Sequence, residues 1–281
     1  MRLFLLTSVT MMAFAANSLL NRLAVSEGHA DPASFAVLRV SAGVVVLITL
    51  VILRGMGAGL LRKPPFLGGA GLAVYMLGFS LAYLSLDAGL GALILFGTVQ
   101  IAMFAISAMR GNRASGRQIT GALLAFLGLV WILFPSGGWS TDLPGAVLMV
   151  LAGLGWSVFT LEGRRVSEPL IATATSFVIC LPFVLLALPL SPVMLTLDAT
   201  GVLLALISGG VTSGLGYALW YHLVPQLEAG VSSAVQLCVP VIALVAGVLL
   251  LGEAASLKLV MGSAIVLFGI VLALRPQNAA A

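Results

Sequence analysis

The chain has 281 residues, of which 61% are apolar and 8% are charged, and its mean hydropathy is +1.19. This composition excludes a soluble globular domain and indicates an integral membrane protein surrounded by the lipid bilayer. In such a protein the net charge of +4 and the pI of about 9.5 are no evidence for nucleic-acid binding, and no nucleic-acid partner is expected.

Ten apolar segments follow one another along the chain, and each is long enough to cross a bilayer as a helix. They cover residues 3–21, 33–54, 65–87, 88–109, 115–134, 143–163, 168–189, 198–221, 229–251 and 256–274. Long apolar runs lack the alternation that is typical of strands, and a helix satisfies its own backbone hydrogen bonds in lipid. We therefore predict an all-α membrane protein with ten transmembrane helices and short connections.

The first segment also resembles a cleavable signal peptide, because Arg2 precedes an apolar stretch that contains Ala13-Phe14-Ala15. Cleavage would leave nine helices. We expect residues 1–15 to remain in the mature protein, since the internal repeat described below requires this segment.

The distribution of basic residues predicts the orientation in the membrane, because cytoplasmic loops carry an excess of Lys and Arg. With the N-terminus inside, ten of the 13 basic residues fall on the inner side. These ten are Arg2, Arg54, Arg62, Lys63, Arg110, Arg113, Arg117, Arg164, Arg165 and Arg275. We therefore expect a multi-pass protein of the cell inner (plasma) membrane with both termini in the cytoplasm.

Arg39 is the one charge that lies deep in a predicted span. Two interpretations stay open: its side chain snorkels outward or pairs with a neighbouring helix, or it meets an anionic group of a ligand. All nine Asp and Glu residues lie at or beyond span ends. Exchange of a proton at a buried carboxylate is therefore not expected, and the choice between proton antiport and uncoupled movement stays open.

Aromatic and amide side chains supply the candidate ligand-binding residues. They are Tyr75, Phe79, Tyr83, Gln100, Trp156, Tyr217, Tyr221 and Gln236. Tyr75, Phe79 and Tyr83 recur every four residues on one face of the third span. Tyr83 and Tyr221 lie near opposite surfaces, which suits an outer and an inner gate. The alternatives are an interfacial aromatic belt for Tyr83, Trp220 and Tyr221, and a structural hydrogen bond for either Gln.

Motifs for catalysis, metal binding or phosphate binding are absent from the sequence. No enzymatic activity, metal or cofactor is therefore expected. Cys180 and Cys238 both fall within spans and are interpreted as small buried residues. The many glycines inside spans are interpreted as sites where helices pack closely, Gly128 and Gly269 among them.

A segment near the middle of the chain returns 141 residues later, which is half of the 281 residues. Residues 88–89 (Ala-Gly) and 114–115 (Ala-Ser) reappear as residues 229–230 and 255–256. We therefore predict two repeats, 1–137 and 138–281, with five spans each. An odd number of spans inverts the second repeat relative to the first, which is a plan typical of secondary transporters.

Ten short spans in two inverted halves resemble the drug/metabolite transporter superfamily, in particular its EamA-type members. Residues 251–253 (Leu-Gly-Glu), followed by Gly262 and Gly269, are similar to the end of that family's repeat. The first half departs from it, with Asn112 where the second has Glu253, so no shared role is assigned to Glu253. By overall resemblance the chain is most similar to the bacterial YddG-like exporters of aromatic amino acids.

The resemblance implies a central cavity that opens alternately to the two sides of the membrane. The third, fourth, eighth and ninth spans would line it, with contributions from the first and sixth. We therefore predict an exporter of small amphipathic metabolites, aromatic amino acids first among them. A metabolite, nucleotide-sugar or drug carrier of the same fold is the alternative, and an intramembrane enzyme or receptor is a remote one. A monomer is compatible with the sequence.

Overall fold

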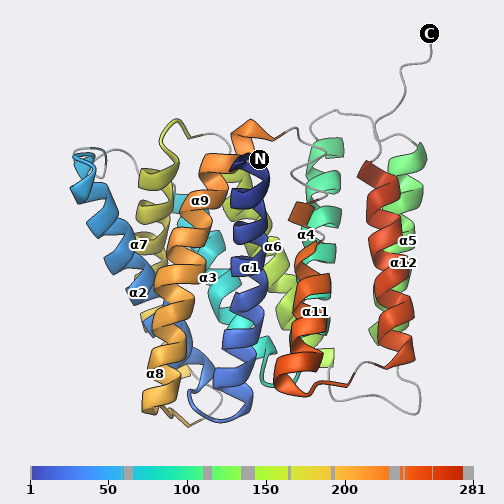
Figure 1. Cartoon of the computed structure of the whole chain (residues 1–281), viewed down its shortest axis with the longest axis horizontal. Helices are drawn as coiled ribbons and strands as arrows, with labels where there is room; N and C mark the ends of the chain where they lie inside the picture. Colours follow the sequence, from blue (N-terminus) through green and yellow to red (C-terminus); the bar gives the residue numbers. More distant parts are fainter. Residues whose placement is uncertain are drawn as a thin grey trace.

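The structure is a computed structural model that describes residues 2–57, 59, 66–109, 116–133, 143–163, 166–190, 194–227, 235–236, 238–254 and 256–274. Helices make up almost all of these residues (Figure 1). The first half contains α1 (Arg2–Ser26), α2 (Pro32–Leu53), α3 (Phe66–Ala82), α4 (Ala88–Met109) and α5 (Gly116–Leu133). The second half contains α6 (Leu143–Gly163), α7 (Pro169–Ala187), η2 (Leu188–Leu190), α8 (Ala199–Leu206), η3 (Ile207–Leu215), α9 (Gly216–Leu223), η4 (Val224–Gln226), α11 (Cys238–Leu251) and α12 (Leu257–Leu274).

The prediction of ten helical spans is confirmed over the described residues. The segments α8, η3, α9 and η4 run on without a break and form one span, Ala199–Gln226. Five spans are long and apolar enough to cross a membrane, and the other five are shorter apolar helices. The first residues of the predicted ninth span, 229–234, lie outside the described residues.

Local sequence sets where several helices begin and end. Asp31 caps α2 by accepting hydrogen bonds from two amides of its first turn, and Asp198 caps α8 by accepting one from the amide of Gly201. Gly55 and Gly252 follow the last turns of α2 and α11 with φ angles of 69° and 66°. Only glycine adopts this left-handed conformation readily, so it ends both helices there.

Helix contacts recur in matching pairs between the two halves. The helix α3 packs on α6, and the span from α8 to α9 packs on α1. In the same way α4 packs on α6 and α11 packs on α1, while α3 contacts α7 and η3 contacts α2. The remaining main contacts join α2 to α7, α4 to α11 and α5 to α12. Figure 1 shows α5 and α12 side by side at one end of the bundle.

Glycines allow the closest of these helix contacts. A Cβ added to Gly155 of α6 would lie 2.8 Å from the backbone nitrogen of Tyr75 on α3. Gly269 of α12 would likewise meet the backbone of α5, and Gly128 of α5 would meet Val266 of α12. The packing interpretation of Gly128 and Gly269 is therefore confirmed, as expected for helices that associate through small residues.

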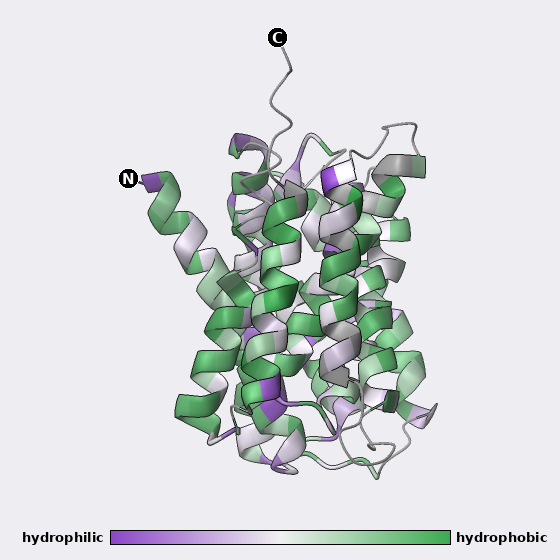
Figure 2. Cartoon of the chain, turned by 90° about the vertical axis from the view of Figure 1, so that its right-hand side faces the viewer, coloured by the Kyte–Doolittle hydropathy of each residue, from purple (hydrophilic) through white to green (hydrophobic). Residues whose placement is uncertain are grey.

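Lipid-compatible side chains cover the outside of the bundle. Large apolar residues such as Phe126, Leu249 and Phe268 are more than half exposed, and Figure 2 shows hydrophobic colour over much of the bundle. The start of α1 lies at the same end of the bundle as the last turns of α12 (Figure 1). Arg62, Lys63, Arg110, Arg113, Arg164, Arg165 and Arg275 lie outside the described residues.

The two cysteines differ in their surroundings. Cys180 is buried in α7, as predicted from its place in a span. Cys238 is exposed at the first residue of α11, so the prediction that it is buried is wrong. A position within a span does not say which face of the helix meets lipid.

Candidate functional site

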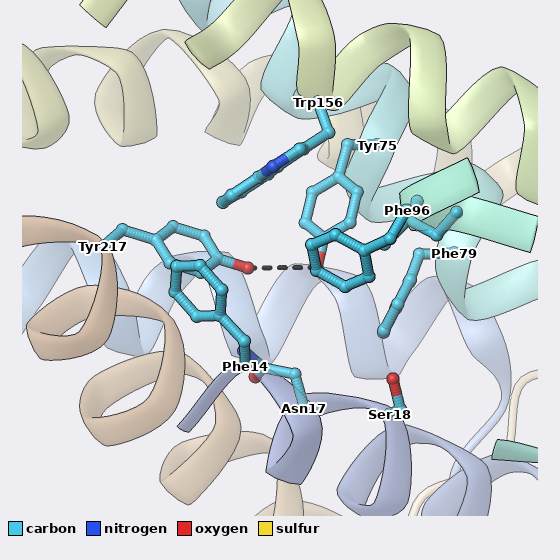
Figure 3. Close-up of a pocket in the computed structure, with 9 residues that line it drawn as sticks. Phe14, Asn17, Ser18, Tyr75, Phe79, Phe96, Trp156 and Tyr217 are labelled. Atoms are coloured by element: carbon cyan, nitrogen blue, oxygen red, sulfur yellow. Dashed lines mark hydrogen bonds between the residues drawn. The ribbon is translucent and has the colours of Figure 1, made fainter. Parts of the chain in front are cut away.

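A small cavity lies inside the bundle where α1, α3, α4, α6 and α9 meet (Figure 3). Its lining residues are Phe14, Asn17, Ser18, Tyr75, Phe79, Leu95, Phe96, Trp156 and Tyr217. Its accessible volume of about 10 Å³ is close to the space that one water molecule needs. A larger solute can therefore enter only when these side chains or their helices move apart.

Aromatic rings form most of the cavity wall. The ring of Trp156 lies 4.7 Å from that of Tyr217, 5.0 Å from that of Tyr75 and 5.7 Å from that of Phe14. Phe79 continues this cluster at 5.1 Å from Tyr75. These separations are typical of favourable aromatic pairs. The rings come from four helices, so any movement that opens the cavity must rearrange contacts between both halves of the chain.

Arg39 of α2 lies directly behind this wall and has no solvent exposure. Its Nη2 atom donates to the hydroxyl groups of Tyr75 at 3.1 Å and Tyr217 at 3.0 Å, and its Nε atom donates to Ser213 at 3.0 Å. The two tyrosine hydroxyls lie 3.0 Å apart and share a hydrogen bond (Figure 3). Outward snorkelling of Arg39 is therefore wrong, and the side chain instead bonds to neighbouring helices.

A second polar cluster connects α1 with the middle of the eighth span. The side-chain oxygen Oδ1 of Asn17 accepts hydrogen bonds from Ser208, Thr212 and Ser213 at 2.9, 2.5 and 3.1 Å. These three hydroxyl groups lie on η3, a nine-residue π-helical stretch. Wide π turns occur often at functional sites. Here the stretch directs Ser213 toward both Asn17 and Arg39.

Tyr83 and Tyr221, the predicted gates, lie at the two ends of the aromatic cluster. The ring of Tyr83 contacts that of Phe79 at 4.8 Å, and the ring of Tyr221 stacks on that of Phe159 at 5.1 Å. The Tyr221 hydroxyl donates to the carbonyl oxygen of Phe159 at 2.7 Å. Both tyrosines and Trp220 are buried, with exposures of 3% or less. The alternative of an interfacial aromatic belt is therefore wrong for these three residues.

The cavity includes only part of the predicted set. Tyr75, Phe79, Trp156 and Tyr217 line it, whereas Gln100 and Gln236 are buried elsewhere and are not among its lining residues. The prediction missed Phe14, Asn17, Ser18, Leu95 and Phe96. The position of Asn17 could have been predicted from the sequence, because a polar side chain deep in a transmembrane segment usually faces the bundle interior. The apolar residues of the lining could not have been predicted in this way.

Charged side chains join loops and helix ends at the end of the bundle opposite Arg2. Arg22 of α1 lies 3.2 Å from a carboxylate oxygen of Asp87 and 3.7 Å from one of Glu253. Glu253 also accepts a hydrogen bond from the first amide of α4 at 2.7 Å. Burial raises the pKa of the Glu253 carboxyl, an effect that the amide hydrogen bond opposes.

A second loop contact lies at the same end of the bundle. His29 Nδ1 lies 2.8 Å from a carboxylate oxygen of Asp198. The amide of Gly201 and the His29 side chain lower the pKa of Asp198. The carboxylate of Asp31 also accepts a hydrogen bond from the amide of Thr196 at 3.0 Å. Together these contacts tie the α1–α2 loop to the segment before α8.

Comparisons with known proteins place the chain among transporters. Residues 143–275 match the EamA-like transporter family. An uncharacterized protein of Pseudomonas aeruginosa is 44% identical over 98% of this chain and 96% of its own length. A Salmonella typhimurium protein named "Probable amino-acid metabolite efflux pump" is 25% identical over 66% of this chain and 67% of its own length. A solved crystal structure shares the fold, with a TM-score of 0.67 and 20% identity over 97% of this chain and 95% of that one.

Together with the bundle of apolar helices, these relationships identify the chain as a multi-pass membrane transporter of the drug/metabolite transporter superfamily. Within it, the chain belongs to the EamA-like transporter family.

Proposed function

We propose that the protein exports small amphipathic metabolites across the inner membrane, with aromatic amino acids as its substrates. The observation that carries this proposal is the aromatic wall of the cavity, in which Phe14, Tyr75, Phe79, Trp156 and Tyr217 surround one small space. Stacking and edge contacts with such rings favour a flat apolar side chain. The efflux-pump name of the Salmonella typhimurium relative agrees with this direction and substrate class.

The mechanism in this proposal is alternating access. The cavity is too small for an amino acid as it stands, and known small-molecule sites have volumes of about 300–1,000 Å³. Tyr83 and Tyr221 would act as gates, because they close the aromatic cluster at its two ends. Binding would then require one end to open at a time.

The matching helix contacts support two inverted repeats, residues 1–137 and 138–281. Each contact of α3 and α4 with α6 has a counterpart in a contact of the eighth and ninth spans with α1. Paired contacts of this kind are what a duplication predicts, and an odd number of spans in each repeat inverts the second one. The same arrangement would let the two halves exchange roles when the cavity changes sides.

Counterflow into proteoliposomes tests the proposal. Vesicles that contain the purified protein are loaded with one unlabelled solute and then receive the same solute with a radioactive label. We expect uptake with Phe, Tyr and Trp, and none with small polar amino acids, nucleosides or cationic drugs. Counterflow of a nucleotide sugar in place of the aromatic amino acids would favour the alternative carrier, and vesicles without protein provide the control.

A further inference from the structure

A buried guanidinium without a carboxylate partner lies directly behind the cavity wall. Arg39 has no solvent exposure, and no ion pair between described residues includes it. Its Nε and Nη2 atoms donate to hydroxyl groups, whereas its Nη1 atom is buried and has no hydrogen-bond partner. Nη1 carries two N–H groups, because arginine has five donors in a planar fork. The charge therefore lacks a counter-charge in the described part of the chain.

Three residues of the cavity wall contact this guanidinium. The hydroxyls of Tyr75 and Tyr217 accept its hydrogen bonds, and its carbon Cζ lies 5.1 Å from the centre of the Phe79 ring. The faces of aromatic rings attract a cation, but they do not neutralise it. The positive charge of Arg39 is thus one side chain away from a ligand in the cavity.

Among the residues that line the cavity, the buried polar atoms without a hydrogen-bond partner are N–H donors. Asn17 and Trp156 line the cavity, and neither Asn17 Nδ2 nor Trp156 Nε1 has a hydrogen-bond partner. Arg39 Nη1, just behind the wall, is the third. The oxygen of Asn17 already accepts three hydrogen bonds. A ligand rich in acceptor oxygens and carrying negative charge would satisfy such a site.

We infer that the transported solute is held by a carboxylate group, which accepts hydrogen bonds from Asn17 Nδ2 and Trp156 Nε1 and balances the charge of Arg39. An ammonium group on the solute is not required, because none of the lining residues is acidic. One guanidinium balances one carboxylate, whereas a diphosphate would keep surplus negative charge. The inference rests on the proposed function and narrows its substrates to aromatic carboxylates, with or without an amino group.

Competition against phenylalanine counterflow separates the two charged groups of the substrate. The competitors are 3-phenylpropionate, which keeps the carboxylate, and phenethylamine, which keeps the ammonium group. We expect 3-phenylpropionate to compete about as well as phenylalanine, and phenethylamine to compete more than about tenfold more weakly, since hydrogen bonds to a charged partner are lost. Equal competition by the two compounds would overturn the inference while leaving transport of aromatic solutes intact.

A thermal-shift assay of the purified protein tests the anion site without any need for transport. We expect 3-phenylpropionate to raise the melting temperature of the unaltered protein, and phenethylamine not to. The shift should vanish in Arg39→Gln and persist in Arg54→Gln, an exposed Arg at the end of α2. Arg39→Gln is expected to alter folding. The comparison of the two ligands on the unaltered protein is therefore the primary test of the anion site.

The two proposals fail in different ways. If phenylalanine counterflow were absent but 3-phenylpropionate still stabilised the protein, the proposed substrates would be wrong and the carboxylate site would stand. The carboxylate site would be wrong if neither 3-phenylpropionate nor phenylalanine changed the melting temperature, and 3-phenylpropionate also failed to compete with phenylalanine counterflow.

Discussion

The hydroxyl groups of Tyr75 and Tyr217 hold Arg39 in place, so Tyr75→Phe and Tyr217→Phe should destabilise the protein. Each change leaves a buried charged donor with one partner fewer, and such a loss is worth about 1.5–3 kcal/mol of unfolding free energy. Thermal melting in detergent measures the effect.

Tyr83→Phe is the matched control for these two variants. Its hydroxyl donates a long 3.4 Å hydrogen bond to the carbonyl oxygen of Ala88 and accepts none of the hydrogen bonds of Arg39, so its removal should change the melting temperature much less. Equal losses of melting temperature in all three variants would contradict a special contribution of the hydrogen bonds to Arg39.

Residue type and depth predicted part of the site from sequence. Tyr75 and Trp156 lie too deep for an interfacial belt, which made them candidates, and both line the cavity. Leu95 and Phe96 carried no such signal, because apolar residues are common throughout every span. The partners of Arg39 could not be predicted either. Tyr217, for example, lies 178 positions away from Arg39 in the sequence and comes close to it only in the folded bundle.

At the scale of elements, the contact between η3 and α2 should tolerate no side chain at Gly209. A Cβ there would overlap the backbone carbonyl of Arg39, and backbone atoms cannot move aside cheaply. Gly209→Ala should therefore cost at least about 1–3 kcal/mol of stability, as overpacking typically does. The yield of monodisperse protein and its melting temperature measure the loss.

Gly210→Ala provides the control from the same π-helical stretch. Its added Cβ would meet only a methyl group of Val46 at 3.2 Å, and that side chain can adjust. We expect a small change in melting temperature. A loss as large as that of Gly209→Ala would contradict the assigned contact.

The loop between α11 and α12 should give the protein a distinctive dependence on pH. Burial raises the pKa of Glu253 above its ordinary value of 4.5, so the folded state binds this proton more tightly than the unfolded chain. The tighter binding of this proton stabilises the folded state fully below pH 4.5, where Glu253 is protonated. This stabilisation is lost as the pH rises through the raised pKa of Glu253. Glu253→Gln should therefore melt at a higher temperature than the unaltered protein near pH 7, and the gap should close toward pH 4.

The opposite result at pH 7 would carry a clear meaning. If Glu253→Gln melted at a lower temperature there, the ion pair with Arg22 at 3.7 Å would outweigh the effect of burial. Asp87→Asn, which changes the more exposed carboxylate of the same cluster, provides the comparison.

Hydropathy predicted the helical elements well, because a membrane leaves few alternatives to helices. The predicted span 143–163 coincides with α6, and 33–54 differs from α2 by one residue at each end. The π-helical stretch η3 was not predicted, because its mixture of small, hydroxyl and aliphatic residues also fits an ordinary transmembrane helix. Its geometry depends on the contacts with Asn17 and α2.

For the whole molecule, the proposed orientation places both termini in the cytoplasm. The start of α1 and the end of α12 lie at the same end of the bundle, which agrees with an even number of spans (Figure 1). A fluorescent protein that matures only in the cytoplasm, fused to the C-terminus, should be bright. A dark fusion that is nevertheless present in the membrane would contradict this orientation.

The most direct test of the account asks whether the solute occupies the cavity between α1, α3, α4, α6 and α9. Trp156→Phe keeps a ring in the cavity wall but removes a buried N–H donor that has no protein partner. Trp131→Phe makes the same change on α5, at a side chain that is 40% exposed and is not among the lining residues. Phenylalanine counterflow per folded transporter should fall about 2- to 13-fold in Trp156→Phe, the equivalent of one hydrogen bond. It should stay unchanged in Trp131→Phe, and equal counterflow in both variants would contradict a substrate site in this cavity.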